Sequence, residues 1–314
     1  RSSLFCFKVK LALVANSWLT PLIVALTYFG IAIGSWPKLR ANRTTITLMG
    51  AGLLIATGQV GFDQIGSFLD LDTLILLFSM MVINANLQMS GFFRLAGSSL
   101  LRLTRTPRAF LALEILLCGL LSAFFLNDTI CLMFTPLVLN ITLNARRNPL
   151  PYLIALATAA NIGSTATLTG NPQNMIIGVA SGISYLDFAI ALTPVALLGL
   201  GGIWLVLILL YPAELTNEAF EPTAIGRIKV YRPLLVKSVL VVLGLLMAFL
   251  SGMPVAMASF LAACVLLFTR RIWPEKVFQE FDWSLLVFFS ALFIVTGSLE
   301  ANGISQQLFN LLKL

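Results

Sequence analysis

Three consecutive polar residues, Asn127-Asp128-Thr129, interrupt a long apolar stretch that covers residues 109–142. A carboxylate inside a membrane span costs several kcal/mol, so a residue such as Asp128 marks a functional site by default. A second interpretation is that Asp128, helped by Thr129, caps the helix that follows it. Capping and ion binding are compatible, because a helix N-terminus also favours bound anions.

A second polar stretch covers residues 161–174 and reads NIGSTATLTGNPQN. Gly163 and Gly170 permit unusual backbone angles, and Pro172 removes a backbone donor. The pattern predicts a helix that is broken inside the membrane, with an ordinary extramembrane loop as the alternative. Unwound carbonyls and side-chain oxygens suit Na⁺, whereas exposed N–H groups and half-helix N-termini suit an anion. Candidate ligands in this stretch are the side chains of Thr167, Thr169, Asn171 and Asn174.

The residues that the sequence lacks restrict any other chemistry. There is no histidine, so histidine-based acid–base chemistry, metal sites and haem ligation are excluded. The four cysteines show no metal-ligand spacing and are interpreted as small core residues. Asp128 is the only aspartate deep in a predicted span, so a membrane protease with paired aspartates is not expected. We therefore expect neither an enzyme nor a resident cofactor.

The composition indicates what must position these residues. Hydrophobic residues make up 59% of the 314 residues and charged residues only 11%, with a mean hydropathy of +0.96. A soluble domain has about 25% charged residues, so this chain is predicted to be an all-α polytopic membrane protein. The net charge of +7 fits basic cytoplasmic loops, and no nucleic-acid partner is expected.

Eight apolar segments are long enough to be predicted spans, since a helix needs about 20 residues to cross the bilayer core. They cover residues 11–33, 44–62, 72–91, 152–167, 188–211, 233–251, 254–269 and 283–299. The interrupted stretch 109–142 is too long for one crossing. It is interpreted as a re-entrant helical hairpin, or as two crossings joined by a tight turn.

The basic residues lie mainly in loops on one side of these spans. They are Lys38, Arg40, Arg43, Arg94, Arg102, Arg105, Arg108, Arg146, Arg147, Arg227, Lys229, Arg232, Lys237, Arg270, Arg271 and Lys276. The opposite loops hold Asp63, Asp70 and Asp187, and only the chain ends place Arg1, Lys8, Lys10 and Lys313 on that side. This asymmetry assigns the basic side to the cytoplasm. It requires residues 109–142 to return to the side they left.

Two segments near the ends of the chain resemble each other. Residues 71–79 (LDTLILLFS) resemble residues 281–290 (FDWSLLVFFS), and LQMSG at 87–91 resembles LEANG at 299–303. The two predicted spans run in opposite directions, which favours an inverted-topology repeat over a chance similarity. The predicted domains are an N-terminal span (1–43), a first repeat (44–211), a connecting region (212–253) and a truncated second repeat (254–314). Within the first repeat, 109–142 form the hairpin and 152–181 the broken helix.

The hairpin tip followed by Gly163, Thr167, Gly170, Pro172 and Asn174 resembles the ion-transporter superfamily of citrate-transporter-like permeases, arsenite permeases and divalent anion/sodium symporters. The resemblance covers roughly residues 44–314. It implies two inverted repeats, each with a re-entrant hairpin and a broken helix, usually in a homodimer.

By this resemblance, the tip and the broken helix surround the substrate and a cation. The residues implied for Na⁺ are Asn127, Asp128, Gly163, Gly170 and Asn174, and Thr129 and Thr167 join them around the substrate. The tip reads Asn-Asp, as in the arsenite-permease branch, and not Ser-Asn-Thr as in the dicarboxylate branch.

The predicted function is secondary active transport of an inorganic or small organic anion by alternating access, coupled to Na⁺ or to H⁺ through Asp128. The alternatives are a sodium/proton antiporter, an arsenite efflux permease, a channel and a non-transporting scaffold. The expected location is a bacterial inner membrane. Glu114, about 21 Å of helix before the tip, is interpreted as a structural residue near the cytoplasmic edge. Asn84 and Gln88 are interpreted as interhelical hydrogen-bonding residues, with cavity lining as the alternative.

Overall fold

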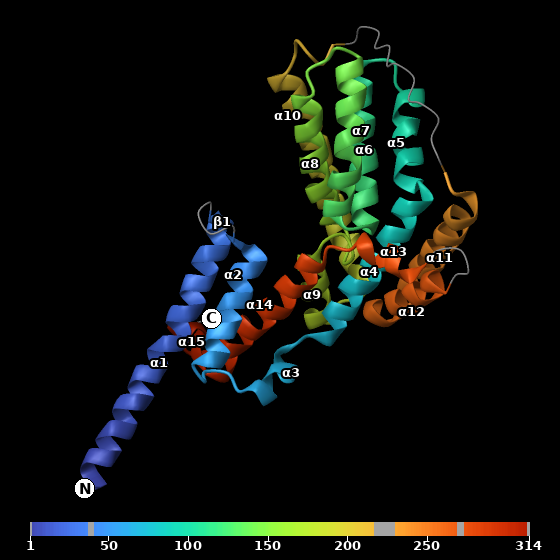
Figure 1. Ribbon diagram of the computed structural model, residues 1–314. Coiled ribbons are helices and arrows are strands. Elements are labelled where there is room, and N and C mark those ends of the chain that lie inside the picture. The colour runs from blue at the N-terminus through green and yellow to red at the C-terminus, as the bar shows by residue number, and fades with distance from the viewer. Residues whose placement is uncertain (1, 37–40, 217–229, 269–272, 313–314) are drawn as a thin grey trace. The chain divides into compact units, whose positions relative to one another are not determined.

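The computed structural model describes residues 2–36, 41–216, 230–268 and 273–312, and these residues are helical almost throughout (Figure 1). This confirms the all-α class. The helices are α1 (Ser2–Ile33), α2 (Arg43–Ala56), the 3₁₀ turn η1 (Phe62–Gln64), α3 (Ile65–Phe68), α4 (Leu71–Ser90), α5 (Phe92–Leu103), α6 (Pro107–Phe124), α7 (Asn127–Asn144), α8 (Leu150–Ser164), α9 (Pro172–Ser181), α10 (Tyr185–Leu210), α11 (Arg232–Leu250), α12 (Val255–Leu267), α13 (Pro274–Gln279), α14 (Trp283–Ala301) and α15 (Ile304–Leu312). Two short antiparallel strands, β1 (Ser35–Trp36) and β2 (Ala41–Asn42), pair Ser35 with Asn42.

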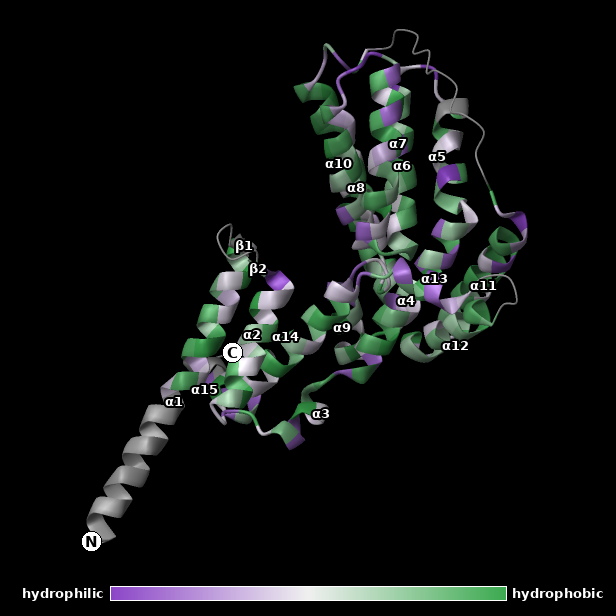
Figure 2. Ribbon diagram, viewed as in Figure 1, coloured by the Kyte–Doolittle hydropathy of each residue, from purple (hydrophilic) through white to green (hydrophobic). Residues whose placement is uncertain are grey.

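Five helices in the described part of the chain are long and apolar enough to cross a membrane, namely α4, α6, α10, α11 and α14. Shorter apolar helices cover the other predicted spans: the second half of α1, and α2, α8 and α12. Figure 2 shows hydrophobic residues along most of the bundle that contains α6, α7, α8 and α10. Hydrophilic residues lie in the connections at the top of this bundle in the view. The prediction of a polytopic membrane protein is confirmed.

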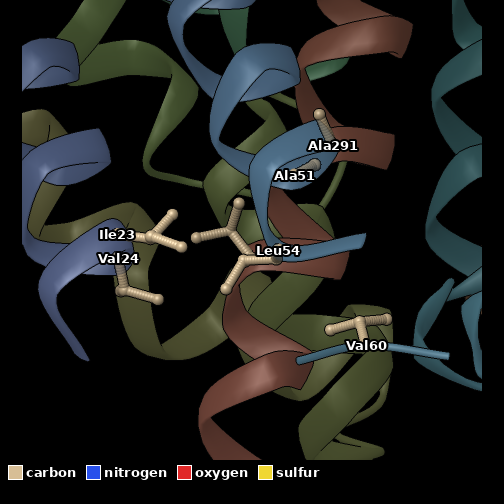
Figure 3. Packing of buried hydrophobic residues seen from close by; sticks show 7 residues of the cluster. Ile23, Val24, Ala51, Leu54, Val60 and Ala291 are labelled. Carbon is tan, nitrogen blue, oxygen red and sulfur yellow. The ribbon is translucent and has the colours of Figure 1, made fainter. Parts of the chain in front are cut away.

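The chain forms two compact units, and each is described by itself. The first comprises Arg1–Leu74 and Asp282–Leu314, in which α2 packs against α1 and α14. Figure 3 shows its core, with Ile23 and Val24 of α1 beside Leu54 of α2. A Cβ at Gly50 would lie 2.2 Å from the Thr27 hydroxyl oxygen, so the missing side chain lets α1 and α2 approach closely.

The second unit, Ile75–Phe281, holds both polar stretches. Helix α8 packs against α6, α7 and α10, while α5 lies against α6 and α7 (Figure 1). Helices α11 and α12 form an antiparallel pair. The Lys237 ammonium on α11 donates to the carbonyls of Leu266 (3.2 Å) and Phe268 (2.9 Å), which satisfies the end of α12.

Several segments that we interpreted as loops are helical. Arg94 belongs to α5, an amphipathic helix that buries Phe93 and Leu100 and leaves Arg94 exposed. Lys237 lies inside α11 and not in a loop. Helix α5 is short and carries charged residues, so it produces no long apolar run and the sequence pattern missed it, whereas α11 matches the predicted span 233–251.

The remaining sequence predictions about topology are not decided by the fold. Arg1, Lys38, Arg40, Arg227, Lys229, Arg270, Arg271 and Lys313, all used in the charge argument, lie outside the described residues. The inverted repeat and the domain limits at residues 43, 211 and 253 stay predictions.

Candidate functional site

The first polar stretch forms the tip of a helical hairpin. Helix α6 ends at Phe124, where the Phe125 N–H donates to the Leu121 carbonyl, and α7 begins at Asn127. The Phe125 ring packs edge-on against Phe92 and Phe93 of α5, with centroid distances of 6.1 and 5.9 Å. The turn is therefore two apolar residues long, and the polar residues that follow it lie in the first turn of α7.

Asp128 lies inside α7, so the interpretation of Asp128 as the cap of this helix is wrong. The N-cap position belongs to Leu126, which makes no side-chain cap hydrogen bond. The Asp128 side chain is exposed, and an acidic residue in the first helical turn is favoured by the helix dipole. The carboxylate thus lies on the exposed side of the tip, which we call its open end.

The second polar stretch breaks a helix, as predicted. Helix α8 ends at Ser164 and α9 begins at Pro172, with Asn171 as its N-cap; the Asn171 side-chain oxygen accepts from the Asn174 N–H at 2.8 Å. Residues 166–171 are buried although they are not helical. Buried backbone groups need hydrogen-bond partners, so other groups must replace the helical ladder here.

Two amide side chains supply many of those partners. The Asn174 amide nitrogen donates to the carbonyls of Thr167 (2.9 Å), Ser164 (3.2 Å) and Thr165 (3.4 Å). The Asn171 amide nitrogen donates to the Ser164 carbonyl (3.2 Å) and hydroxyl (3.1 Å). Three carbonyl oxygens therefore converge on one side-chain amide.

The tip and the break are in direct contact. The Asn127 N–H donates to the Gly170 carbonyl at 3.1 Å, and its side-chain amide donates to Asn161 at 2.9 Å. The Thr167 hydroxyl donates to the Ala123 carbonyl. Four helix ends thus meet at one place, the C-terminal ends of α6 and α8 and the N-terminal ends of α7 and α9.

Glycines allow this close approach. A Cβ built on Gly163 would lie 2.1 Å from the Gly119 carbonyl oxygen on α6. A Cβ on Gly170 would lie 2.2 Å from the Ser164 carbonyl oxygen and 2.8 Å from that of Ser122. Backbone cannot move aside as a side chain can, so both positions require glycine for packing, whatever they bind.

The depth of the tip follows from the helix lengths. Helix α8 covers 15 residues and α9 covers 10, which correspond to about 22 and 15 Å. The tip contacts the segment between them, so the hairpin ends partway along the α8–α9 crossing. This favours the re-entrant hairpin over two complete crossings.

Most of the predicted site residues are thus brought together, although their binding roles stay predictions. Asn127, Thr167 and Gly170 take part in the contact between the hairpin and the break, and the Thr169 hydroxyl lies 3.4 Å from that of Thr167. Gly163 packs on Gly119 of α6, and Asn171 and Asn174 make their hydrogen bonds within the break. Thr129 faces elsewhere, because the Asn84 amide nitrogen of α4 lies 3.4 Å from its hydroxyl.

Asn161 and Ser164, on the last turn of α8, were not among the predicted site residues. Asn161 is exposed beside the tip, and Ser164 accepts from both amides of the break. Spacing alone gave no signal for Asn161, since its partner Asn127 lies on another helix. Asn84 and Gln88 make the predicted interhelical contacts, and Gln88 donates to Glu280 at 2.7 Å. The Asn84 side-chain oxygen is buried with no partner among the described residues.

Glu114 is a buried carboxyl group on α6. Its side chain is fully buried in the bundle, and neither carboxyl oxygen has a hydrogen-bond partner within the described residues. Helix α6 packs extensively against α8, which fits the structural role that we expected for Glu114. Its position near the cytoplasmic edge stays a prediction.

Comparisons with known proteins agree with the resemblance. A family model described as citrate transporter matches residues 23–314. The silicon efflux transporter LSI3 of Oryza sativa subsp. japonica is 28% identical over 88% of this chain and 70% of its own length. A Dictyostelium discoideum protein named as transporter arsB is 32% identical over 56% of the chain and 31% of its own length. The inner membrane protein YbiR of Escherichia coli is 30% identical over 72% of the chain and 59% of its own length.

Proposed function

This chain belongs to the citrate transporter family, and on that premise we propose that it carries a small inorganic or organic anion across the membrane by alternating access. The observation that supports this function best is the meeting of four helix ends at the contact between tip and break. Helix ends carry partial charges without ionisable side chains, so they bind an ion and still release it.

The anion would bind at the N-terminal ends of α7 and α9. No lysine or arginine lies in residues 127–129 or 161–174, so full positive charges are absent from both stretches. Each helix N-terminus contributes about 0.3–1 kcal/mol to anion binding at exposed sites, and more in partly buried geometry. The side-chain amides of Asn127 and Asn161 lie beside this contact, and each has a second N–H besides the one in the hydrogen bond to Asn161 or to the Ala157 carbonyl.

Sodium would bind where the carbonyls of Ser164, Thr165 and Thr167 converge. Oxygen ligands of this kind suit a hard cation. The Asn174 amide nitrogen occupies the focus of these carbonyls in this structure. Rotation of that amide by half a turn replaces its donor with an oxygen, so that Asn174 becomes a fourth ligand. Proton coupling through the exposed Asp128 is the alternative.

The residues of the hairpin tip guide the choice of substrate. The Asn127-Asp128 pair resembles the arsenite-permease branch, and the names of two relatives refer to silicon efflux and to arsB. We therefore place arsenite and similar oxyanions first, with efflux as the direction, and citrate second. A sodium/proton antiporter is the other candidate, because Asp128 is an exposed titratable group at the open end of the tip.

The assembly and location are also proposals. The relative YbiR is an inner membrane protein, and we place this chain in the inner membrane of a bacterium. Exposed apolar residues along α1 and α2, such as Phe29, Leu48 and Met49, suit lipid or a homodimer contact.

The experiment is uptake of labelled arsenite, sulfate, phosphate and citrate into proteoliposomes, with and without a Na⁺ gradient. The test variant is Asp128→Asn, and the matched control is Asp187→Asn at the start of α10. We expect one anion to be carried faster with the gradient, and this stimulation to be lost only in Asp128→Asn. Intact stimulation in Asp128→Asn would remove Asp128 from the site. Acidification or alkalinisation of the lumen by Na⁺ without anion flux would support the antiporter.

A further inference from the structure

A cavity of about 370 Å³ lies in the second unit between α6, α8, α10 and α11. Its lining is apolar except for the hydroxyl-bearing Thr167, Tyr185 and Thr193. Pockets for small molecules begin at about 300 Å³, so the space is large enough for a ligand. It is separate from the open face of the tip, where Asp128 and Asn161 are exposed.

Small residues create this space. Gly119 and Ala123 of α6 and Ala189, Thr193 and Ala196 of α10 line it. Ala123 and Ala196 also pack together with Ala166 in one buried cluster, so they form the floor of the cavity. The two helices approach closely at Gly119 as well, where a Cβ would lie 2.7 Å from Leu200. Tyr185 at the start of α10 stacks on Phe249 of α11, with ring centroids 4.7 Å apart. The cavity is therefore a wedge between α6 and α10, with Leu200 and Tyr185 at its two ends.

The mouth of the wedge opens on an exposed apolar surface of the second unit. Leu116, Leu120, Leu197 and Leu250 line it, and each is more than half exposed. Helices α10 and α11 are apolar enough to cross a membrane, and little of their length is buried within the protein. The cavity is thus continuous with an apolar surface that we expect to contact lipid.

An empty apolar cavity loses dispersion contacts on every wall, and water has few polar partners in it. The bilayer presents acyl chains to its mouth at high concentration. We propose that the cavity is a binding site for one acyl chain of a membrane phospholipid. The chain enters between Leu120 and Leu197 and lies against Ala123 and Ala196.

The inner wall of the cavity gives this site a consequence. It includes Gly163, Ala166 and Thr167, so it is the reverse side of the contact between break and tip. The Ala123 carbonyl, which accepts from Thr167, belongs to the same wall. A bound acyl chain therefore supports the contact between α6 and the break, and its removal loosens that contact.

The test is photolabelling of the protein in vesicles by a phosphatidylcholine that carries a diazirine at the end of one acyl chain. Ala196 is buried, so bulk lipid around the protein cannot label it, whereas Leu198 on the same helix is 78% exposed. We expect adducts at both positions in the unaltered protein. Ala189→Leu fills the cavity and should abolish labelling at Ala196 but not at Leu198. Ala191→Leu, the same change on the lipid-facing side of α10, should leave both unchanged.

Absence of label at Ala196 in the unaltered protein overturns the proposal, since a second copy or another part of the protein then fills the space. Equal labelling of Ala196 in Ala189→Leu and Ala191→Leu also overturns it. If Ala189→Leu fails to fold, Thr193→Leu fills the same cavity from the next turn and replaces it. Size-exclusion profiles of all variants establish that they are folded.

Discussion

The hairpin tip and the helix break both interrupt helices, but they hold the interrupted backbone in different ways. Both interrupt helices at positions that we predict to lie within the membrane, where backbone groups need partners in the protein. The tip does so with a two-residue apolar turn held by phenylalanine rings, and it leaves Asp128 exposed. The break buries six non-helical residues and holds them with the amides of Asn171 and Asn174. The break is therefore a hydrogen-bonded frame that also carries the proposed sodium ligands, whereas the tip presents its polar groups on an exposed side.

This difference can be tested by comparing stability with transport. Substitutions in the break should lower the free energy of unfolding, because they remove packing or backbone hydrogen bonds. Substitutions at the tip should leave that free energy nearly unchanged and impair transport.

The largest effect is expected for Gly163→Ala. The new Cβ would lie 2.1 Å from the Gly119 carbonyl, and relief requires α6 and α8 to separate. We expect a loss of about 3 kcal/mol in the free energy of unfolding, measured by thermal unfolding in detergent. The control is Gly201→Ala on α10, where nothing lies within 4 Å and a gain of up to about 1 kcal/mol is expected. Similar unfolding temperatures for both variants would contradict the close contact.

A smaller loss is expected for Asn174→Ala. The substitution leaves the carbonyls of Ser164, Thr165 and Thr167 without this donor, and an unsatisfied buried group costs about 1–3 kcal/mol. We expect a decrease of about 2 kcal/mol in the same unfolding measurement. The exposed neighbour Gln173→Ala should change it by less than about 0.5 kcal/mol. If sodium binds at these carbonyls, it stabilises the unaltered protein but not Asn174→Ala.

Asn84→Leu should separate stability from function. The Asn84 oxygen is already buried without a partner, so an apolar residue of similar size should change the free energy of unfolding by less than about 1 kcal/mol. The variant loses the contact with Thr129, and we expect slower anion flux in proteoliposomes. Asn86→Leu is the matched control, because the Asn86 amide bonds only to its own helix in the described structure. Equal flux in both variants would show that the link between α4 and the tip is not used.

Asp128→Asn should have the smallest effect on stability. The side chain is exposed, and surface substitutions usually change the free energy of unfolding by less than about 0.5 kcal/mol. A much larger loss in the free energy of unfolding would show that Asp128 supports the folded structure, which would contradict the comparison between tip and break. The control is again Asp187→Asn, which removes a carboxylate that accepts from the Ser184 hydroxyl at 2.6 Å.

The two interruptions were predictable from the sequence because a membrane tolerates polar residues and glycines at depth only under constraint. Asp128 and the stretch around Gly163 and Gly170 broke the apolar pattern for that reason. The partners were not predictable, since the link from Asn127 to Asn161 joins two helices whose packing no spacing reveals. Helix α5 was missed because its arginine residues resemble a loop when only apolar runs are counted.

Lys237 of α11, whose ammonium bonds to the end of α12, has a consequence for the membrane itself. Helix α12 has 13 residues, about 20 Å, whereas the hydrocarbon core of a bilayer is about 30 Å thick. The Lys237 ammonium bonds to the last carbonyls of α12, so charge and headgroups must reach that level. We therefore expect the bilayer to thin next to α11 and α12, and this hydrophobic mismatch to favour short-chain lipids there.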